Sequence, residues 1–422
     1  EAAAGRRRRR SMRRAAWWLG SPSMRRGFCA DAAPRLARAQ PLRPFLVEQY
    51  RGWTDPTVEF PSLSSSECEP LSLQQLIALA DDASLRQWEA LSLGYPAFNA
   101  GSLWLREEIA SLYADAIGPG QVNVLAPQEG IYLAMRALLS PGAHVVVTSP
   151  CYQSLYEVAR SMGCELSHWR PRGLAQEEGC APRFDPEDLA ALLRPSTALV
   201  VANWPHNPTG ALPTEAEAGE VVRQCEATGA HLLVDEMYRG LEHGERGPLP
   251  AACDAYARGI SLGGVSKALG LPGLRIGWLA SRDQDFLGAV SRYKDYTSIC
   301  PAAPSEMLAT IALRNQATII AANRSRIARG KEALHALASR QANHLGWSEP
   351  MGGPFAFLRL KQGASAEAYC EALRARAQLM LVPSPCFEFG DEHVRVTFGH
   401  DATLSRLRRW EGDLAMHGLD CP

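Results

Sequence analysis

Short apolar runs separated by segments of helical length restrict this chain to a small set of folds. The runs are His144–Thr148, Thr197–Ala202 and Ala230–Val234. A short apolar run between turn residues is typical of a strand that is buried on both faces of a parallel sheet. Helices are expected between the runs, over Tyr152–Met162 and Glu215–Ala227. This alternation predicts an α/β fold with a mainly parallel sheet, in which ligands bind beyond the carboxyl ends of the strands.

The pattern changes near Pro304, after which a smaller α+β domain is expected. A long stretch rich in Ala, Arg, Leu and Ile, over Ser305–Ala342, predicts a single helix. The other expected elements are helices over Leu71–Leu79, Arg106–Ile117, Ile131–Leu139 and Ala366–Ala377, and strands over Gly353–Leu360 and His393–Phe398. The predicted parts are a basic leader, a segment that joins the small domain, a large ligand-binding domain and a small C-terminal domain, over residues 1–40, 41–90, 91–304 and 305–422.

The leader has a composition of its own. It contains eleven arginines, and its acidic residues are Glu1 and Asp31. An Arg-rich, acid-poor segment is typical of an organelle transit peptide, and Arg26–Cys29 resembles a processing site. The alternatives are a disordered basic tail or a translated upstream stretch, since the chain begins with Glu. A transit peptide would direct the protein to a mitochondrion or a plastid, and without one the cytoplasm is expected.

The composition of the whole chain argues against several classes of partner. The net charge is −1, so neither nucleic acid nor an anionic membrane surface is expected to bind. The sequence has no apolar run of membrane-spanning length. Its eleven cysteines are scattered, without a C-x-x-C pair or a Cys/His cluster at metal-ligand spacing. This predicts reduced thiols and no metal site.

Lysine is rare among the basic residues of this chain. Only four of the 44 basic side chains are lysines, namely Lys267, Lys294, Lys331 and Lys361. An amine can lose its proton and attack a carbonyl, whereas a guanidinium stays charged. Lys267 lies in Ser261–Trp278, a stretch rich in glycine and poor in charge that would favour the neutral amine. Lys267 is therefore a candidate imine-forming lysine, and the alternative is a surface lysine on a glycine-rich loop.

Four motifs follow one another along the chain. They are N-W-P-H-N-P-T-G at Asn203–Gly210, D-E-M-Y at Asp235–Tyr238, Ser266-Lys267 with Arg275 eight residues further on, and Arg395 in V-R-V-T-F. In this order and at this spacing, the chain closely resembles the class I/II aminotransferases over roughly Leu71–Leu407. These are fold type I enzymes that use pyridoxal phosphate (PLP). The resemblance implies a mainly parallel seven-stranded sheet flanked by helices in the large domain, plus a smaller α+β domain.

The resemblance assigns residues of these motifs to the cofactor. Lys267 would form an aldimine with PLP and then act as the base at the substrate Cα. Asp235 would pair with the protonated pyridine nitrogen, while Tyr238 and Asn207 would hydrogen-bond the phenolic oxygen O3′. Tyr152 would stack on the pyridine ring. Taken singly, Asp235 could be a turn carboxylate, Asn207 could form only an Asx turn, and Tyr152 could simply pack in the core.

The resemblance also implies a phosphate site and a carboxylate site. Ser266 and Arg275 would hold the cofactor phosphate, together with the helix N-terminus around Gln128 and Glu129. Arg395 would form a bidentate pair with the substrate α-carboxylate. The alternative for Arg395 is a surface residue at a strand edge.

Some positions depart from the usual pattern of the family. Ala126-Pro127 precedes Gln128 where a Gly-Ala-Ser/Thr turn is usual, and Pro127 has no N–H to offer a phosphate. Tyr95 is the candidate for the tyrosine that reaches the phosphate of the neighbouring subunit's cofactor. It lies six residues before Gly101, whereas a spacing of five is usual.

The loop Ser64–Pro70 stands where many relatives have a Gly-Glu-Pro segment that lines the substrate pocket. This loop contains the carboxylates of Glu67 and Glu69. They could receive a cationic side chain, such as that of arginine or a related guanidino amino acid, so a basic or polar amino donor is expected. The alternative is that the loop is simply a solvated face.

The resemblance implies an aminotransferase that moves the α-amino group of an amino acid to a 2-oxo acid, in a homodimer with shared active sites. A lyase or cyclase on the same scaffold stays open, of the C–S lyase, aminocyclopropane-carboxylate synthase or capreomycidine synthase type, because all of them begin from the same bound amino acid. A transcription regulator with an aminotransferase-like domain would need a helix-turn-helix module ahead of the fold. The Arg-rich leader has no such pattern.

Overall fold

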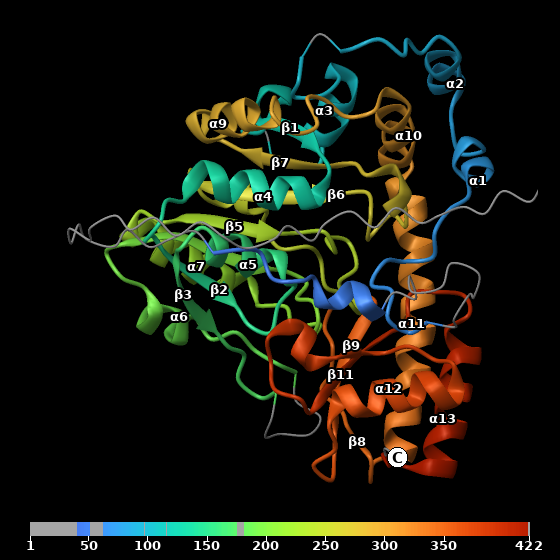
Figure 1. The fold of residues 1–422 in the computed structure, drawn as a ribbon. Helices are drawn as coiled ribbons and strands as arrows, with labels where there is room; N and C mark the ends of the chain where they lie inside the picture. The colour runs from blue at the N-terminus through green and yellow to red at the C-terminus, as the bar shows by residue number, and fades with distance from the viewer. Residues whose placement is uncertain (1–39, 51–61, 97, 115, 175–180, 421–422) are drawn as a thin grey trace, which may run out of the picture. The chain divides into compact units, whose positions relative to one another are not determined.

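The computed structural model of the chain describes residues 40–50, 62–96, 98–114, 116–174 and 181–420 (Figure 1). Of the basic leader, only Gln40 falls within these ranges. The expected processing site at Arg26–Cys29 lies outside them, so the targeting that depends on it stays a prediction. No helix in the described ranges combines the length and the apolar character needed to cross a bilayer.

A seven-stranded mixed sheet carries the first of the two core regions (Figure 1). Its strands are β1 Val122–Leu125, β2 His144–Thr148, β3 Glu165–Trp169, β4 Thr197–Asn203, β5 His231–Asp235, β6 Gly259–Gly264 and β7 Gly277–Ser281. They lie in the order β1-β7-β6-β5-β4-β2-β3. β7 is antiparallel to both of its neighbours, and every pair from β6 to β3 is parallel. The predicted α/β class with a mainly parallel seven-stranded sheet is confirmed.

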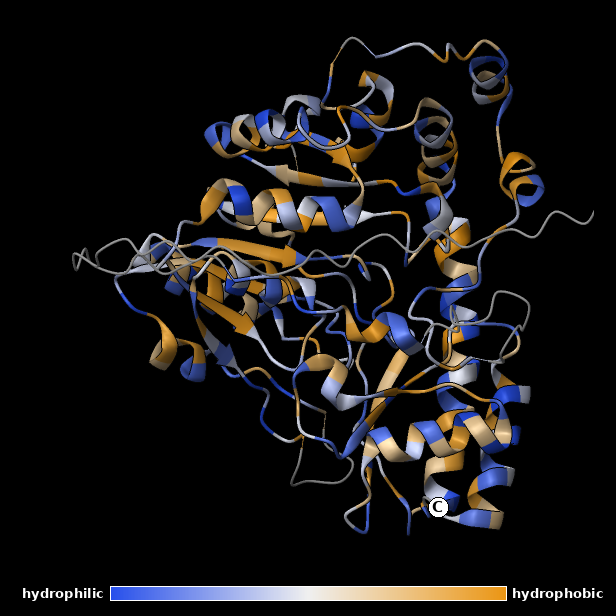
Figure 2. Cartoon of the chain, in the orientation of Figure 1, coloured by the Kyte–Doolittle hydropathy of each residue, from blue (hydrophilic) through white to orange (hydrophobic). Residues whose placement is uncertain are grey.

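Helices cover both faces of this sheet, which explains its apolar strands. The helices are α4 Pro127–Leu138, α5 Ser154–Ser161 and α9 Gln284–Lys294 on one face, and α6 Pro186–Leu192, α7 Glu215–Thr228 and α8 Ala252–Ala255 on the other. Adjacent residues of a strand point to opposite faces. Accordingly, Val145 and Val147 of β2 pack under α4 and α5, whereas Val146 packs toward α6 and α7. Figure 2 shows the resulting hydrophobic colour along β5 and its neighbours.

The second core region is built on a four-stranded antiparallel sheet in the order β10-β11-β9-β8. Its strands are β8 Leu345–Gly346, β9 Phe355–Leu360, β10 Val382–Pro383 and β11 His393–Thr397. Helices α11 Gln316–Arg340, α12 Ala366–Ala377 and α13 Thr403–His417 pack with it around the buried side chains of Phe355, Tyr369 and Trp410. This is the expected smaller α+β region. The domain boundaries near residues 90 and 304 stay predictions.

Two expected helices differ in the structure. The predicted helix Ser305–Ala342 is two helices, α10 Ala303–Arg314 and α11, because Asn315 leaves the helical conformation (φ −109°, ψ 14°) and its side-chain amide donates to the carbonyl of Ile311 at 2.8 Å. The helix predicted over Arg106–Ile117 is α3 Leu103–Ala110. It ends early where the hydroxyl of Ser111 donates to the carbonyl of Glu108, a local bond that competes with helix continuation.

The remaining short elements are α1 Leu73–Ile77, α2 Asp82–Glu89, η1 Leu46–Tyr50, η2 Pro119–Gln121, η3 Pro272–Leu274 and η4 Ser384–Phe387.

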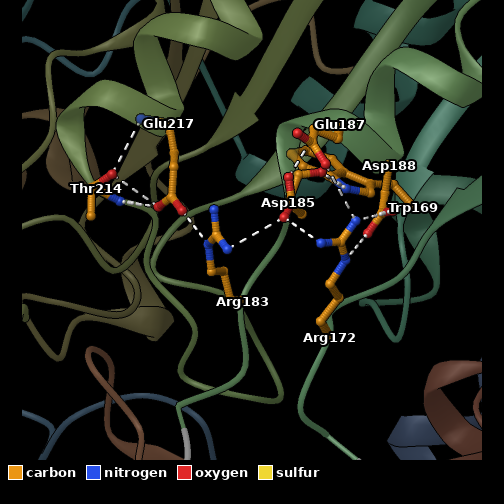
Figure 3. A network of polar contacts seen from close by, with 8 residues as sticks. All are labelled: Trp169, Arg172, Arg183, Asp185, Glu187, Asp188, Thr214 and Glu217. Atoms are coloured by element: carbon orange, nitrogen blue, oxygen red, sulfur yellow. Dashed lines mark hydrogen bonds and ion pairs between the residues drawn. The ribbon is translucent and has the colours of Figure 1, made fainter.

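A polar network holds the connection that follows the edge strand β3 (Figure 3). Asp185, the N-cap of α6, accepts from the guanidinium of Arg172 at 2.7 Å and lies 3.3 Å from that of Arg183. Arg183 also pairs with Glu217 in the first turn of α7. The indole N–H of Trp169 donates to the carbonyl of Asp185. The network therefore ties β3, α6 and α7 together at the edge of the large sheet.

An extended segment joins the small sheet to the loop after β6. Leu63 is paired with Met380 and Thr397 beside β11. A few residues later, the N–H of Leu71 donates to the carbonyl of Gly270 at 3.3 Å. Gly270 has φ +65°, and a Cβ there would lie 2.4 Å from the carbonyl oxygen of Glu69. Only glycine fits this close approach without strain.

Gly270→Ala is expected to destabilise the fold by about 2–4 kcal/mol, because it adds a backbone clash to the roughly 1–2 kcal/mol cost of a left-handed alanine. Gly142→Ala is the matched control, since Gly142 has φ +84° and nothing within 4 Å of its Cβ position. Urea denaturation of both variants measures the difference. Equal losses of unfolding free energy would show that the contact with Glu69 costs nothing.

Candidate active site

The carboxyl ends of β4, β5 and β6 bring polar residues of separate motifs together. Asn203 ends β4 and is in register with Asp235, which ends β5. Lys267 follows in the loop after β6. A cavity of about 650 Å³ opens at this edge of the sheet. Its lining consists of Phe45, Glu48, Ser66, Pro127, Gln128, Ile131, Tyr152, Asn207, Asp235, Met237, Tyr238, Leu262, Ser266, Lys267, Pro272, Gly273 and Arg275.

Asp235 is a buried carboxyl group in the cavity wall. It is 7% exposed, and its Oδ1 accepts a hydrogen bond from the N–H of Met237 at 3.1 Å. Burial raises the pKa of Asp235 to about 7, while the hydrogen bond from Met237 and the charge of Lys267 act to lower it. A nearby cation would stabilise the ionised form. The protonated pyridine nitrogen of PLP would be such a cation.

Side chains of the loop Ser64–Pro70 contact the amine of Lys267. Its Nζ donates to Ser66 Oγ at 2.9 Å and lies 3.5 Å from Glu67 Oε2. Glu67, expected to receive a cationic substrate side chain, therefore faces the chain's own amine. Glu69, the second candidate, instead accepts from the N–H of Asp401 at 2.8 Å and is not among the lining residues.

Asn207 connects the end of β4 to Arg395. The N–H of Asn207 donates to Asn203 Oδ1 at 2.7 Å, and Asn207 Oδ1 accepts from the guanidinium of Arg395 at 2.9 Å. Arg395 is 3% exposed and also donates to the carbonyl of Ser64. Asn207 lines the cavity, whereas Arg395 lies just behind it.

Two tyrosines stand in the wall as expected from the sequence. Burial raises the pKa of the Tyr238 hydroxyl, and a hydrogen bond with Ser66 opposes the rise. This phenol therefore stays protonated at neutral pH and can donate a hydrogen bond into the cavity. The ring of Tyr152 packs against Phe45, with ring centroids 5.2 Å apart.

The cavity lining also includes groups suited to a phosphate. Ser266 Oγ is buried and has no hydrogen-bond partner among the described residues, which is costly for a hydroxyl. Arg275 and Gln128 line the same cavity, and Gln128 lies in the first turn of α4, where backbone N–H groups are free of intrahelical partners. A phosphate would give Ser266 its partner.

Two predicted phosphate residues lie elsewhere. The carboxylate of Glu129 accepts from the hydroxyl of Thr297 and from the N–H of Ser298, so it points toward that loop and not into the cavity. Tyr95 is 84% exposed and is not a lining residue of this chain's own cavity. Its expected role concerns a neighbouring subunit.

The residues present fit PLP. Asp235 suits the pyridine nitrogen, Ser266 and Arg275 suit the phosphate, and the amine of Lys267 suits the aldehyde. Among the described residues, no group of three His, Cys, Asp or Glu side chains is arranged to hold a metal ion.

Sequence reasoning missed part of the lining. Phe45 and Glu48 come from the segment around η1, and Ser66 comes from the serine-rich loop. Ser66 belongs to the loop Ser64–Pro70, which the resemblance places at the substrate pocket, but neither spacing nor periodicity distinguishes it from Ser64 and Ser65. No sequence signal pointed to Phe45 or Glu48.

Comparison with known proteins agrees with the fold. Residues 99–409 match the model of the family "Aminotransferase class I and II". Capreomycidine synthase of Streptomyces vinaceus is 32% identical over 383 residues, which cover 90% of this chain and 93% of that protein. A PLP-dependent aminotransferase of Streptococcus suis superposes with a TM-score of 0.79 at 27% identity, covering 90% of this chain and 99% of that one. The PLP-dependent cyclase OrfR superposes with a TM-score of 0.77 at 28% identity, covering 90% of this chain and 100% of that one.

The fold and the cavity define a fold type I enzyme scaffold of the PLP-dependent class. The chain belongs to the class I and II aminotransferase family, whose members use PLP and act on amino acids. The resemblance seen in the sequence is confirmed.

The raised pKa of Asp235 makes the stability of the cofactor-free protein depend on pH. Its pKa of about 7 lies above the ordinary value of 3.8, so the folded state holds more protons between these values, and the free energy of unfolding falls as the pH rises through this window. Asp235→Asn removes the buried charge. It is expected to raise the Tm of the cofactor-free protein at pH 8 by roughly 2 °C or more, and to weaken PLP retention.

Scanning calorimetry at pH 5 and pH 8 measures the effect, and the exposed Asp285→Asn is the control. A Tm of Asp235→Asn below that of the unmodified protein at pH 8 would contradict the buried-charge account.

Proposed function

We propose that the protein binds PLP through Lys267 and is an aminotransferase, which moves the α-amino group of an amino acid to a 2-oxo acid. The observation that carries the proposal is the convergence of Lys267, Asp235 and Ser266 on one cavity of about 650 Å³. PLP, when bound, supplies an electron sink for the bond at the substrate Cα.

Each residue of the site would have a separate role in this reaction. Arg395, with Asn207 oriented by it, would hold the substrate α-carboxylate. Lys267 would remove the proton from the substrate Cα and pass it to the cofactor carbon C4′. Asp235 would keep the ring nitrogen protonated, and Tyr238 would donate a hydrogen bond to the phenolic oxygen.

A cyclisation or elimination is the second candidate function. It is favoured by the similarity, over nine-tenths of this chain, to a capreomycidine synthase and to a PLP-dependent cyclase. Both reactions begin with removal of the Cα proton, so the same residues would serve either one. They differ in whether a group then leaves from the substrate side chain.

Two glutamates from the N-terminal part of the chain, one in the cavity wall and one beside it, favour a substrate amino acid with a cationic side chain. Glu48 lines the cavity, and Glu67 adjoins it at Lys267. Glu67 lies 3.5 Å from Lys267 Nζ, and both carboxylates would place negative charge near the cationic side chain of a substrate. Charge complementarity of this kind selects among substrates of similar size.

A homodimer is proposed from exposed aromatic side chains on two adjoining segments. Tyr95, Phe98 and Tyr296 are 84%, 66% and 91% exposed. The amide of Asn99 donates to the carboxylate of Asp295 at 2.8 Å, which holds the two segments together. Exposed apolar side chains that gather in this way mark an interface. Pairing across it would also bring Tyr95 of one subunit toward the other's cofactor.

The PLP-loaded enzyme is to be mixed with arginine, lysine, citrulline, leucine and phenylalanine in separate reactions without a 2-oxo acid. Transamination is expected to consume the visible absorbance of the cofactor and to release one 2-oxo acid per site without ammonia. Arginine should react at least about tenfold faster than citrulline, which has the same shape without the charge.

Release of ammonia or a cyclic product with the visible band retained would instead establish the second candidate. Arginine and lysine reacting no faster than leucine or phenylalanine would contradict the cationic substrate. A protein that takes up no PLP would contradict both functions.

A further inference from the structure

The loop before Glu67 carries a hydroxyl group to which the proposed function assigns no role. Ser66 is 6% exposed, and its Oγ accepts a hydrogen bond from Lys267 Nζ at 2.9 Å. The same side chain is hydrogen-bonded to Tyr238. Ser66 thus links the amine that would act as the base to a phenol in the same cavity wall. The Gly-Glu-Pro segment that is usual in the family at this loop has no hydroxyl group.

The position of Ser66 is fixed by backbone contacts on both sides. Before it, the carbonyl of Ser64 accepts from the buried guanidinium of Arg395. After it, the N–H of Cys68 donates to the carbonyl of Lys267 itself at 3.3 Å. Cys68 is fully buried. Because the loop is bonded to the backbone of Lys267, little conformational entropy is lost when the two side chains meet.

We propose that Ser66 and Glu67 are positioning residues for the Lys267 amine, and that they hold the proton that this amine takes from the substrate Cα. The proposal rests on the proposed function, and it applies equally to transamination and to cyclisation. It concerns the orientation of the Lys267 amine and the stability of its protonated form.

The proton balance of the step is simple. The neutral amine of Lys267 accepts one proton from Cα and becomes an ammonium group, while the electron pair of the C–H bond stays with the substrate. Ser66 Oγ accepts one N–H of the ammonium group, and Glu67, 3.5 Å away, balances its charge. The ammonium group would then give the proton to the cofactor carbon C4′ in transamination, or to the group that leaves the substrate side chain in the second candidate reaction, and return to the neutral amine. Neither Ser66 nor Glu67 gains or loses a bond.

A carboxylate and a hydroxyl acceptor beside an amine favour its charged form. In the complex with substrate, only the neutral amine can remove the Cα proton, so kcat should rise with pH as the ammonium form is lost. Removing either acceptor destabilises the ammonium form. The rise in kcat should therefore move to lower pH, and kcat itself should fall because the amine is less well oriented.

The test compares Ser66→Ala, Glu67→Gln and Ser66→Thr in the PLP-loaded enzyme, with Ser65→Ala as the matched control. Ser65 is a neighbouring serine that does not line the cavity. Ser66→Ala is expected to lower kcat by about 10- to 100-fold with KM changed by less than about threefold. The pH at which kcat rises should move down by roughly half a unit to one unit in Ser66→Ala and by about one unit in Glu67→Gln.

A spectroscopic readout is independent of turnover. The nitrogen of Lys267 would stay within reach of Ser66 and Glu67 when it is joined to the cofactor, because the loop is bonded to the backbone of Lys267. The pH at which the visible absorbance band changes form should therefore also move down in both variants. Ser66→Thr keeps the hydroxyl group and should stay within about threefold of the unmodified enzyme in kcat. Ser65→Ala should change neither the band nor kcat.

A Ser66→Ala enzyme with the kcat, pH profile and band of the unmodified protein would overturn the proposal. So would a Ser66→Thr enzyme that binds PLP but loses as much kcat as Ser66→Ala. If Ser66→Ala does not fold, Glu67→Gln and Ser66→Thr decide by the same criteria. Failure of the proposed function is distinguishable, because it would appear as an unmodified protein without a cofactor band or without turnover.

Discussion

Burial of the Asp235 carboxyl group at the end of β5 is the constraint around which the site is arranged. A carboxyl group with 7% exposure and a pKa raised to about 7 is stable as an anion only beside a cation or strong donors. The parallel register of β4, β5 and β6 places Asn203 and the Lys267 loop next to it. The seven-stranded sheet thus determines which side chains share the cavity with this carboxyl group.

The position of the Lys267 amine depends in turn on the small sheet. Lys267 is bonded through Ser66 to a loop that is itself fastened to β11 by way of Leu63 and Arg395. A displacement of the small sheet would therefore be transmitted to the amine, and the two core regions jointly determine its position. This arrangement explains why a residue as distant in sequence as Arg395 belongs to the same site as Lys267.

The sequence predicted the fold class because short apolar runs and the helical segments between them are local patterns, and their alternation indicates an α/β fold. The strand predicted at His144–Thr148 is identical to β2, and Asp235 and Lys267, which were candidates from separate motifs, both line one cavity. The break at Asn315 was missed because a single residue changes the path of two helices that share one composition. Ser66 and Glu48 were missed because contacts with residues far away in sequence place their segments at the cavity. Only the folded chain shows which of three consecutive serines faces the lysine.

The most direct test of the central claim is to load the protein with PLP, reduce it with borohydride and locate the modified residue by peptide mass spectrometry. Reduction converts the bond between a lysine and the cofactor into a stable secondary amine. The account predicts a phosphopyridoxyl group on Lys267 and none on Lys294, Lys331 or Lys361. A label on one of these other lysines, or no label at all, would contradict the assignment of Lys267 as the residue that binds the cofactor.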